Sequence, residues 1–353
     1  MNEPRNTPQS RLSMDPFAPG DIARRLEAAN VSRASLPARR LLLLGLVGGV
    51  YISFGGALAT LVLTDNILGY GLGRFVAGLA FSLGLIMLVV AGGELFTGNN
   101  MMVLALAGRK ITFGAMLRNW AVVYPANAAG AVLLAIAIHY AGVLDGNGVK
   151  ATAVKIAEGK ALLDPPTAFL RGVLCNMLVC LAVWLSAAAR SVEGKVVAIA
   201  FPISAFVALG FEHCVANFYL LTIGLLSGAQ ITAAGYASNI AFVTAGNTLG
   251  GILIALILYL IYLGKDQVLR SRVFSRPLAS PVSGQDEAPP AHTANSNEPS
   301  REQAPAEEPV QTAAVRFRLK SMHADAAASP PKDPVRTTPS WLEPRSKDGQ
   351  GRH

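Results

Sequence analysis

Six long apolar stretches dominate the first 264 residues of this chain and limit what it can fold into. They cover residues 41–63, 75–106, 120–140, 168–189, 196–226 and 240–263. Each reaches the ~20 residues that a helix needs to cross a bilayer. With 52% hydrophobic and only 15% charged residues, the chain is also too apolar for a soluble globular protein. The sequence therefore predicts an all-α polytopic membrane protein with six transmembrane helices.

The second and fifth stretches are unusually long, and each is interrupted by a short polar segment. Residues 92–97 (GGELFT) carry Glu94, and residues 210–214 (GFEHC) carry Glu212 and His213. An ionisable side chain at bilayer depth is costly unless it faces protein or a water-filled cavity, and irregular backbone is tolerated there only beside such a cavity. We therefore expect the second and fifth helices to be broken and to line a pathway across the membrane.

The interruptions occupy corresponding places in the two halves of the chain. We pair Glu94 with Glu212 and, on the third span of each half, Asn119 with Asn247. Paired broken segments of this kind point to a substrate site between inverted repeats. The expected architecture is two inverted three-helix repeats related by a pseudo-two-fold axis in the membrane plane.

Positively charged residues indicate the orientation of the spans. They concentrate in segments on one side, at residues 33–40, 109–118, 190–195 and 265–272. The loops on the opposite side carry fewer cations. By the positive-inside rule, both termini are expected in the cytoplasm.

Composition divides the chain into three parts. Residues 1–40 form an expected cytoplasmic segment with a short amphipathic helix between residues 16 and 30, lying along the inner membrane face. Residues 41–264 form the transmembrane domain. Residues 265–353 hold twelve of the 21 prolines and are expected to be a disordered cytoplasmic tail, whose partner the sequence does not identify.

Several functional classes find no support in the sequence. Cys175, Cys180 and Cys214 fall within predicted spans, where small buried apolar residues are expected, and none shows Cys-x-x-Cys spacing. We expect no metal and no cofactor. We also expect no enzyme activity, since no nucleophile stands beside a base. The net charge of +8 reflects loops and tail rather than a nucleic-acid-binding module.

Three segments resemble signatures of the formate/nitrite transporter family. Residues 93–99 (GELFTGN), 172–184 (GVLCNMLVCLAVW) and 208–217 (ALGFEHCVAN) are similar to its first, second and third signatures, in that order. The resemblance covers residues 17–262. It implies an aquaporin-like fold of six spans, five protomers in a ring in the bacterial inner (plasma) membrane, and one anion pathway through each protomer.

Members of this family carry small monovalent weak-acid anions, so the resemblance implies such a substrate together with a proton. The stretch 187–218 is most similar to the formate branch, which makes formate the expected substrate. Nitrite is the alternative, because Glu94 stands where the best-known formate channels have aspartate and residues 98–100 (GNN) replace a more hydroxylated stretch. Hydrosulfide and short monocarboxylates such as acetate or lactate are further alternatives in the same pore.

The physical problem for such a pathway is to deliver a proton to the anion. A bare anion in the middle of a membrane is costly, whereas its neutral conjugate acid can pass an apolar slit. His213 is the only histidine in a polar interruption, and the unperturbed pKa of imidazole lies near neutrality. Thr97 can hydrogen-bond either this histidine or the substrate. Glu94 and Glu212 are expected to cap half-helices or to pair with backbone donors of the opposite repeat.

The resemblance also implies roles for other residues. Lys160 matches a lysine at the outer mouth that draws anions inward. Asn176 and Asn247 are amides within spans that join the polar path. Five apolar residues match the constrictions above and below the central site: Phe81, Leu85, Leu95, Val179 and Phe206.

Each assignment has a simpler alternative. His213 can stay neutral and act only as a polar donor, while the anion takes its proton from water in the vestibule. Lys160 can simply face solvent, and Asn176 and Asn247 can hold helices together without touching substrate. A channel for neutral solutes such as glycerol or ammonia would share the fold but show no pH-coupled anion flux. The sequence leaves open whether the protein is a channel or a proton symporter.

Overall fold

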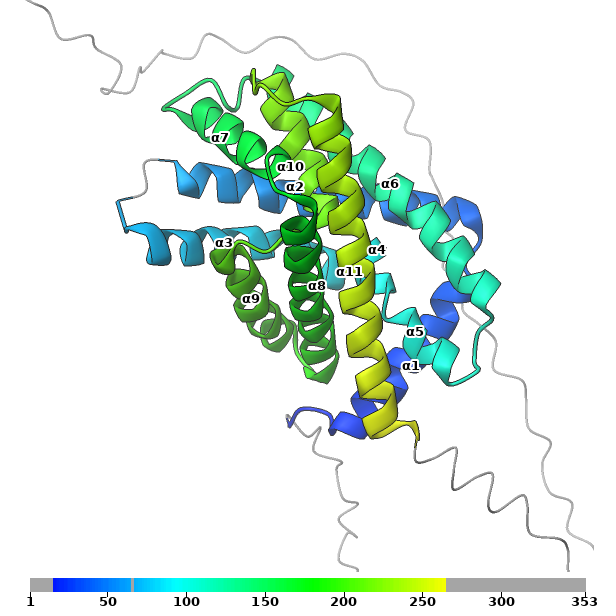
Figure 1. Ribbon diagram of the computed structural model, residues 1–353. Coiled ribbons are helices and arrows are strands. Elements are labelled where there is room, and N and C mark those ends of the chain that lie inside the picture. Colours follow the sequence, from blue (N-terminus) through cyan, green and yellow to red (C-terminus); the bar gives the residue numbers. More distant parts are fainter. Residues whose placement is uncertain (1–14, 65–66, 265–353) are drawn as a thin grey trace, which may run out of the picture. The chain divides into compact units, whose positions relative to one another are not determined.

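The computed structural model describes residues 15–64 and 67–264 (Figure 1). Within them every regular element is a helix, and six helices are long and apolar enough to cross a membrane. These six are α2 (Ala38–Leu63), α3 with its continuation η1 (Tyr70–Gly92), α6 (Phe113–Tyr140), α8 (Pro165–Ala188), α9 (Val192–Leu209) and α11 (Ala233–Tyr262). The all-α, six-span prediction is confirmed. The predicted tail at residues 265–353 lies outside the described residues.

The third and sixth spans begin seven residues before the predicted apolar stretches. Helix α6 starts at Phe113 rather than at residue 120, and α11 starts at Ala233 rather than at residue 240. In each case a threonine caps the helix, since the Thr112 side chain accepts from the Ala115 N–H and that of Thr232 from the Gly235 N–H. Hydropathy marks the part of a helix that is apolar, whereas the cap marks where the helix begins.

A carboxylate caps the fourth span in the same way. The Asp164 side chain accepts a hydrogen bond from the backbone N–H of Thr167, and this bond lowers the pKa of Asp164. Two prolines, Pro165 and Pro166, follow at the first helical positions, where their missing N–H groups cost nothing. Helix α8 therefore begins at Pro165, three residues before the predicted start.

The spans pack in the same pattern in each half. Helix α2 packs against α3 and α6, α8 packs against α9 and α11, and α3 meets α9 between the two groups (Figure 1). Backbones approach closely at matching glycines. A Cβ on Gly130 of α6 would overlap the carbonyl oxygen of Leu46, and one on Gly250 of α11 would overlap that of Val173. Small residues at these crossings are typical of helices packed within a membrane.

The second and fifth apolar stretches each contain more than one helix. Helix α3 (Tyr70–Met87) continues as the π-helical turn η1 (Leu88–Gly92), and extended residues 93–95 precede the short helices α4 (Phe96–Asn99) and α5 (Met102–Ala107). Helix α9 ends at Leu209, residues 210–213 are not helical, and α10 (Cys214–Leu226) follows. The ordered polar interruptions thus separate helical segments in both stretches.

The N-terminal helix packs against protein. Helix α1 spans Pro19–Ser35, and its Ile22, Ala23 and Leu26 are buried in a cluster with Met101 and Met102. The apolar face of α1 contacts α5 and α8. Its expected place along the inner membrane face stays a prediction. In the second half, α7 (Val149–Ala161) packs against α10 in a comparable way.

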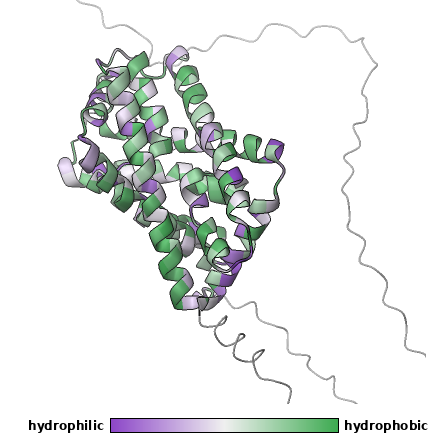
Figure 2. Cartoon of the chain, turned by 45° about the vertical axis from the view of Figure 1, so that its right-hand side comes forward, coloured by the Kyte–Doolittle hydropathy of each residue, from purple (hydrophilic) through white to green (hydrophobic). Residues whose placement is uncertain are grey.

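Large apolar side chains remain exposed along the spans. Hydrophobic residues cover most of the length of the helices in Figure 2. Leu43 on α2, Phe201 on α9 and Leu260 on α11 are 56%, 61% and 67% exposed. Extended apolar surfaces of this kind mark contact with a membrane or another protein.

Candidate functional site

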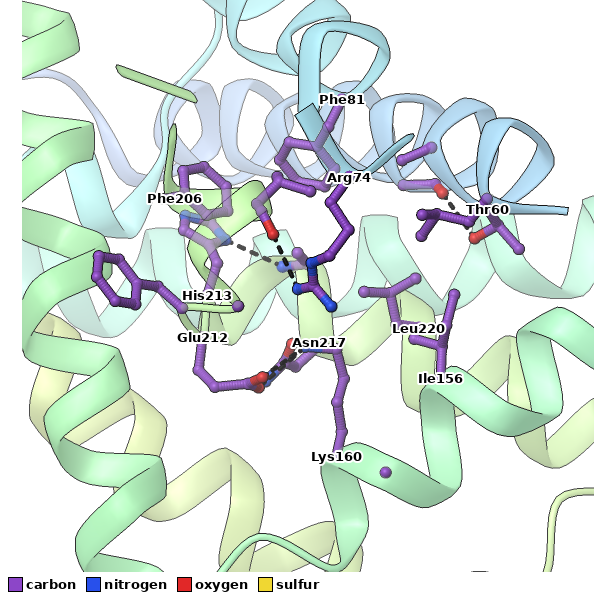
Figure 3. A pocket seen from close by; sticks show the side chains of 18 of the residues that line it. Thr60, Arg74, Phe81, Ile156, Lys160, Phe206, Glu212, His213, Asn217 and Leu220 are labelled. Carbon is purple, nitrogen blue, oxygen red and sulfur yellow. Dashed lines mark hydrogen bonds and ion pairs between the residues drawn. The ribbon is translucent and has the colours of Figure 1, made fainter. Parts of the chain in front are cut away.

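A cavity of about 560 Å³ lies among α2, α3, α7 and α8, the end of α9 and the start of α10 (Figure 3). Its wall combines aromatic side chains with ionisable ones. Phe81 and Phe206 line it together with Arg74, Lys160 and His213. A mostly apolar cavity with a few convergent polar groups is the usual form of a site for a small ligand.

A hydrogen bond of His213 connects the two polar interruptions. Its Nε2 lies 2.9 Å from Oγ1 of Thr97, a residue of α4, and both side chains are buried. Its Nδ1 accepts a hydrogen bond of 3.1 Å from the backbone N–H of Ala216, so the histidine caps α10. Its ring also stacks on Phe206, with centroids 6.1 Å apart.

These bonds define the tautomer of the histidine. A backbone N–H can only donate, so Nδ1 of His213 carries no proton and the neutral ring holds its proton on Nε2. The Nε2–H group then donates to Thr97, whose own hydroxyl proton stays available for another acceptor. The pair therefore holds a hydroxyl donor next to the cavity, which His213 lines and Thr97 does not.

The capping role expected for the two glutamates is wrong. His213 rather than Glu212 caps α10, and α4 has no side-chain cap. The glutamate carboxylates instead accept hydrogen bonds from side chains of cations and amides. A buried carboxylate needs such donors to balance its desolvation.

In the second half, a chain of polar side chains runs through Glu212. Nζ of Lys160 lies 2.9 Å from both carboxylate oxygens, and the lysine side chain is only 15% exposed. Nδ2 of Asn217 donates to the same carboxylate and to Oδ1 of Asn239. The structure places Lys160 at the end of α7 and in an ion pair, not in an open loop.

The first half holds the matching chain through Glu94. Nε of Arg33 lies 3.2 Å from one carboxylate oxygen of Glu94, and Nδ2 of Asn99 donates to the other oxygen and to Oδ1 of Asn119. The sequence analysis missed Arg33, Asn99, Asn217 and Asn239. Spacing could have revealed the amides, because an asparagine follows each glutamate by five residues.

Two further asparagines bind the backbone of the interruptions, and we call them the bracketing asparagines. Nδ2 of Asn127 donates to the carbonyls of Gly45 and Glu94, and its Oδ1 accepts from the Phe96 N–H. Asn247 makes the same three bonds, to the carbonyls of Gly172 and Glu212 and from the Cys214 N–H.

The pairing of Asn119 with Asn247 is therefore wrong. The residue that bonds like Asn247 is Asn127, and Asn119 matches Asn239. In each half the two asparagines lie eight residues apart on one helix, a spacing visible in the sequence.

Asn176 connects α8 to its neighbours. Its Nδ2 lies within 3.2 Å of the carbonyls of Thr97 and Asn247 and of the side-chain oxygen of Asn100. Its own Oδ1 has no hydrogen-bond partner among the described residues. The amide group therefore holds the helices around Thr97, while its oxygen remains unpaired.

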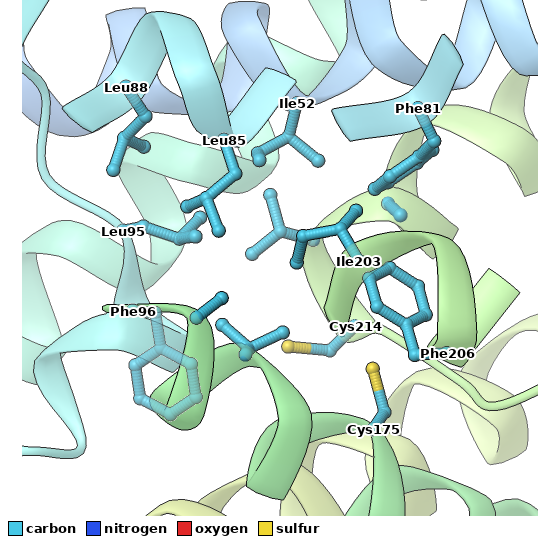
Figure 4. Packing of buried hydrophobic residues seen from close by; sticks show 14 of the residues in the cluster. Ile52, Phe81, Leu85, Leu88, Leu95, Phe96, Cys175, Ile203, Phe206 and Cys214 are labelled. Atoms are coloured by element: carbon cyan, nitrogen blue, oxygen red, sulfur yellow. The ribbon is translucent and has the colours of Figure 1, made fainter. Parts of the chain in front are cut away.

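The five predicted constriction residues share one buried cluster. Phe81 and Phe206 meet edge to face with ring centroids 5.4 Å apart. In Figure 4, Leu85 and Leu95 extend toward each other on one side of the cluster, and Phe81 and Phe206 lie on the other side. Val179 is buried in the same cluster, and so are Cys175 and Cys214.

Most of the described chain matches known proteins. A profile of the family described as formate/nitrite transporter matches residues 20–261. A "Probable formate transporter" of Methanothermobacter thermautotrophicus is 37% identical over 262 residues, which are 69% of this chain and 95% of the relative.

Two solved structures are also similar. An "FNT family ion channel" has a TM-score of 0.63 and 29% identity, covering 68% of this chain and 98% of that one. A "Pentameric formate channel with formate bound" has a TM-score of 0.56 and 32% identity, covering 64% of this chain and 98% of that one.

Proposed function

Because this chain belongs to the formate/nitrite transporter family, we propose that it transports formate across a membrane. The observation that carries the proposal is the buried Thr97–His213 pair beside a cavity lined by Phe81 and Phe206. The names of a formate-transporting relative and of a formate-bound structural neighbour support formate as the substrate.

The proposed transport step is linked to a proton. Formate enters the cavity, where the ammonium group of Lys160 helps to attract it. The Thr97 hydroxyl donates a hydrogen bond to one formate oxygen, while Nε2–H of His213 donates to Thr97. Formate takes a proton that comes from the external solution as hydronium, which leaves water behind. It then passes the apolar slit as neutral formic acid, which avoids moving a bare charge through a low dielectric.

His213 serves in this scheme as a fixed donor. A proton on Nδ1 would remove the acceptor that caps α10 at the Ala216 N–H. The geometry therefore favours the version in which the histidine stays neutral and solvent supplies the proton. Protonation still takes place near the central histidine, as the sequence analysis expects.

We also propose that the two halves are inverted repeats with broken second and fifth spans. Support comes from two matching sets of hydrogen bonds. In each half an interruption glutamate binds an asparagine five residues later, at Glu94 and Glu212, and we call these the acid–amide chains. In each half a second asparagine, Asn127 or Asn247, binds the backbone of the interruption. Residues 41–264 then form the transport domain. The aquaporin-like arrangement that the family resemblance implies is part of the same proposal.

The proposed assembly is a homopentamer in the bacterial inner membrane, with both termini in the cytoplasm. The structural neighbour described as pentameric supports the assembly. The exposed apolar side chains of α2, α9 and α11 offer surface to neighbouring protomers and to lipid. The distribution of cations supports the orientation.

Nitrite is the second candidate substrate. Glu94 occupies the position where the formate branch has aspartate, and its carboxylate is bound by Asn99, one of the residues that replace the more hydroxylated stretch. Formate and nitrite are similar in size, shape and charge. A slit with one hydroxyl donor discriminates weakly between them.

The test is uptake into proteoliposomes of formate, nitrite, lactate and chloride at several external pH values. Formate flux is expected to rise as the external pH falls, because the protonated fraction that can cross rises, and chloride is expected to stay outside. Replacing His213→Ala or Thr97→Val should lower formate flux by about tenfold, the loss expected for one hydrogen bond to a charged group.

Thr97→Ser is the matched control, because it keeps the hydroxyl and should keep most of the flux. Flux that is independent of pH, or equal for chloride, would overturn the proton-linked scheme. A nitrite flux higher than the formate flux would identify nitrite rather than formate as the preferred substrate.

A further inference from the structure

Arg74 on α3 binds the end of a helix from the other half of the chain. Its Nε donates to the carbonyl oxygen of Ala208 at 3.0 Å, and its Nη2 donates to that of Val207 at 2.9 Å. Both acceptors belong to the last turn of α9. The guanidinium is partly buried and lines the same cavity as His213 and Phe206 (Figure 3).

The last turn of α9 needs such a partner. Gly210 ends the helix in the left-handed region at φ 74°, and the Phe211 N–H returns to the carbonyl of Phe206. The carbonyl of Val207 also accepts from the Gly210 N–H, whereas that of Ala208 lies at the end of the helix, where no following turn supplies an intrahelical donor. A cation at a helix C-terminus also interacts favourably with the helix dipole.

The same face of α3 touches α9 at two more levels. Gly78 lies one turn after Arg74, and a Cβ there would come within 2.6 Å of Cα of Ser204. Phe81 follows within another turn and meets Phe206 edge to face. Phe206 directly precedes Val207, so the arginine holds the turn that carries one wall of the aromatic slit.

We propose that Arg74 is a positioning residue that sets the width of the slit between Phe81 and Phe206 and so limits the size of the carboxylate that passes. The inference rests on the proposed transport function. Arg74 touches the backbone beside Phe206, and its effect on selectivity is transmitted through that backbone. Without the two hydrogen bonds, the last turn of α9 and its phenylalanine gain freedom to move apart from α3.

The test must distinguish the effect of the positive charge of Arg74 from the effect of its two hydrogen bonds to α9. A guanidinium has five N–H donors, and two of those of Arg74 are used on α9. Arg74→Lys keeps the positive charge in the cavity but loses the planar fork that binds two carbonyls at once. Arg74→Gln removes the charge as well. Lys155→Gln is the matched control, because it removes a cation that lines the same cavity from α7.

The first measurement is the ratio of formate flux to lactate flux in proteoliposomes. Both Arg74 variants should lower this ratio by about tenfold, the discrimination that small changes in an apolar pocket provide. Lys155→Gln should keep the wild-type ratio. A wild-type ratio in Arg74→Lys would overturn the proposal, because the effect would then come from charge alone.

The second measurement does not depend on transport. Hydrogen–deuterium exchange of the full-length protein in nanodiscs should become faster at residues 206–211 in Arg74→Lys and stay at the wild-type rate in Lys155→Gln. Unchanged exchange in Arg74→Lys would refute the role of Arg74. A third outcome is that exchange becomes faster in Arg74→Lys but the wild-type protein transports no small anion. This outcome would refute the proposed transport and would still support the contact of Arg74 with α9.

Discussion

The two interruptions hold the same kinds of polar side chains but end the preceding helices differently. After α9, the chain makes a regular turn at Gly210, Arg74 binds the last carbonyls, and the side chain of His213 starts the next helix. After α3, the helix widens into the π-helical turn η1, and Val90 and Gly92 are exposed.

From this difference we infer that the polar segments have two tasks, stabilising the fold and supporting the slit. The acid–amide chain is the same in both halves, so it serves the fold, which needs every buried carboxylate to be paired. We infer that the helix ends differ because only the end of α9 carries a phenylalanine of the proposed slit, Phe206. Matched variants in the two halves test this separation of tasks, and each of the following experiments compares one such pair.

The largest effect is expected at the two buried ion pairs. Glu212→Gln leaves Lys160 without its partner and should lower the free energy of unfolding by about 3 kcal/mol, as is typical when one partner of a buried pair is removed. Glu94→Gln should cost less, because the side chain of Arg33 is 29% exposed and that of Lys160 only 15%. Thermal unfolding of the purified protein, compared between the two variants, measures the difference.

The control for the ion pairs is the double variant Lys160→Met with Glu212→Gln. It removes the unpaired cation and should recover part of the lost stability. Equal losses for Glu94→Gln and Glu212→Gln would contradict the expected effect of exposure.

A smaller and equal effect is expected at the two bracketing asparagines. Asn127→Leu and Asn247→Leu each leave buried backbone groups without a partner, which costs about 2 kcal/mol. The bonds are the same in both halves, so the two losses should agree. Denaturant unfolding of both variants checks this, and a clear inequality would show that the halves differ in their core as well as at their helix ends.

The smallest effect is expected at Gly92 and Gly210, the positive-φ glycines of the two interruptions. Gly92→Ala and Gly210→Ala each place a side chain in a strained conformation that costs about 1 kcal/mol. A Cβ on Gly210 would also lie 3.1 Å from Nη2 of Arg74, whereas one on Gly92 would meet nothing within 4 Å. Only Gly210→Ala should therefore change the ratio of formate flux to lactate flux. The same change in both variants would argue that the two helix ends act alike.

Much of this architecture was readable from residue types and spacing. The six spans follow from apolar length, and the glutamates in the interruptions indicate where the polar path lies. The acid–amide chains were also within reach, because Glu94 and Asn99 have the same spacing as Glu212 and Asn217. The error at Asn119 arose from comparing positions along the spans instead of distances between the asparagines.

Other features depend on contacts that no local pattern encodes. Arg74 binds two backbone carbonyls more than 130 residues away, and a carbonyl carries no residue identity that could signal the contact. The π-helical turn at Leu88–Gly92 has no distinctive composition. The ion pair of Lys160 with Glu212 was not predicted, because sequence spacing does not show that a glutamate from a distant segment lies beside this lysine.

The bond between Thr97 and His213 joins residues 116 positions apart, which has a consequence for biosynthesis. A ribosome that has inserted the first three spans has made the threonine but not its histidine partner. The pair can form only after the fifth apolar stretch has left the translocation machinery. A chain truncated before that stretch therefore lacks the Thr97–His213 pair, and the proposed transport site is completed only late in synthesis.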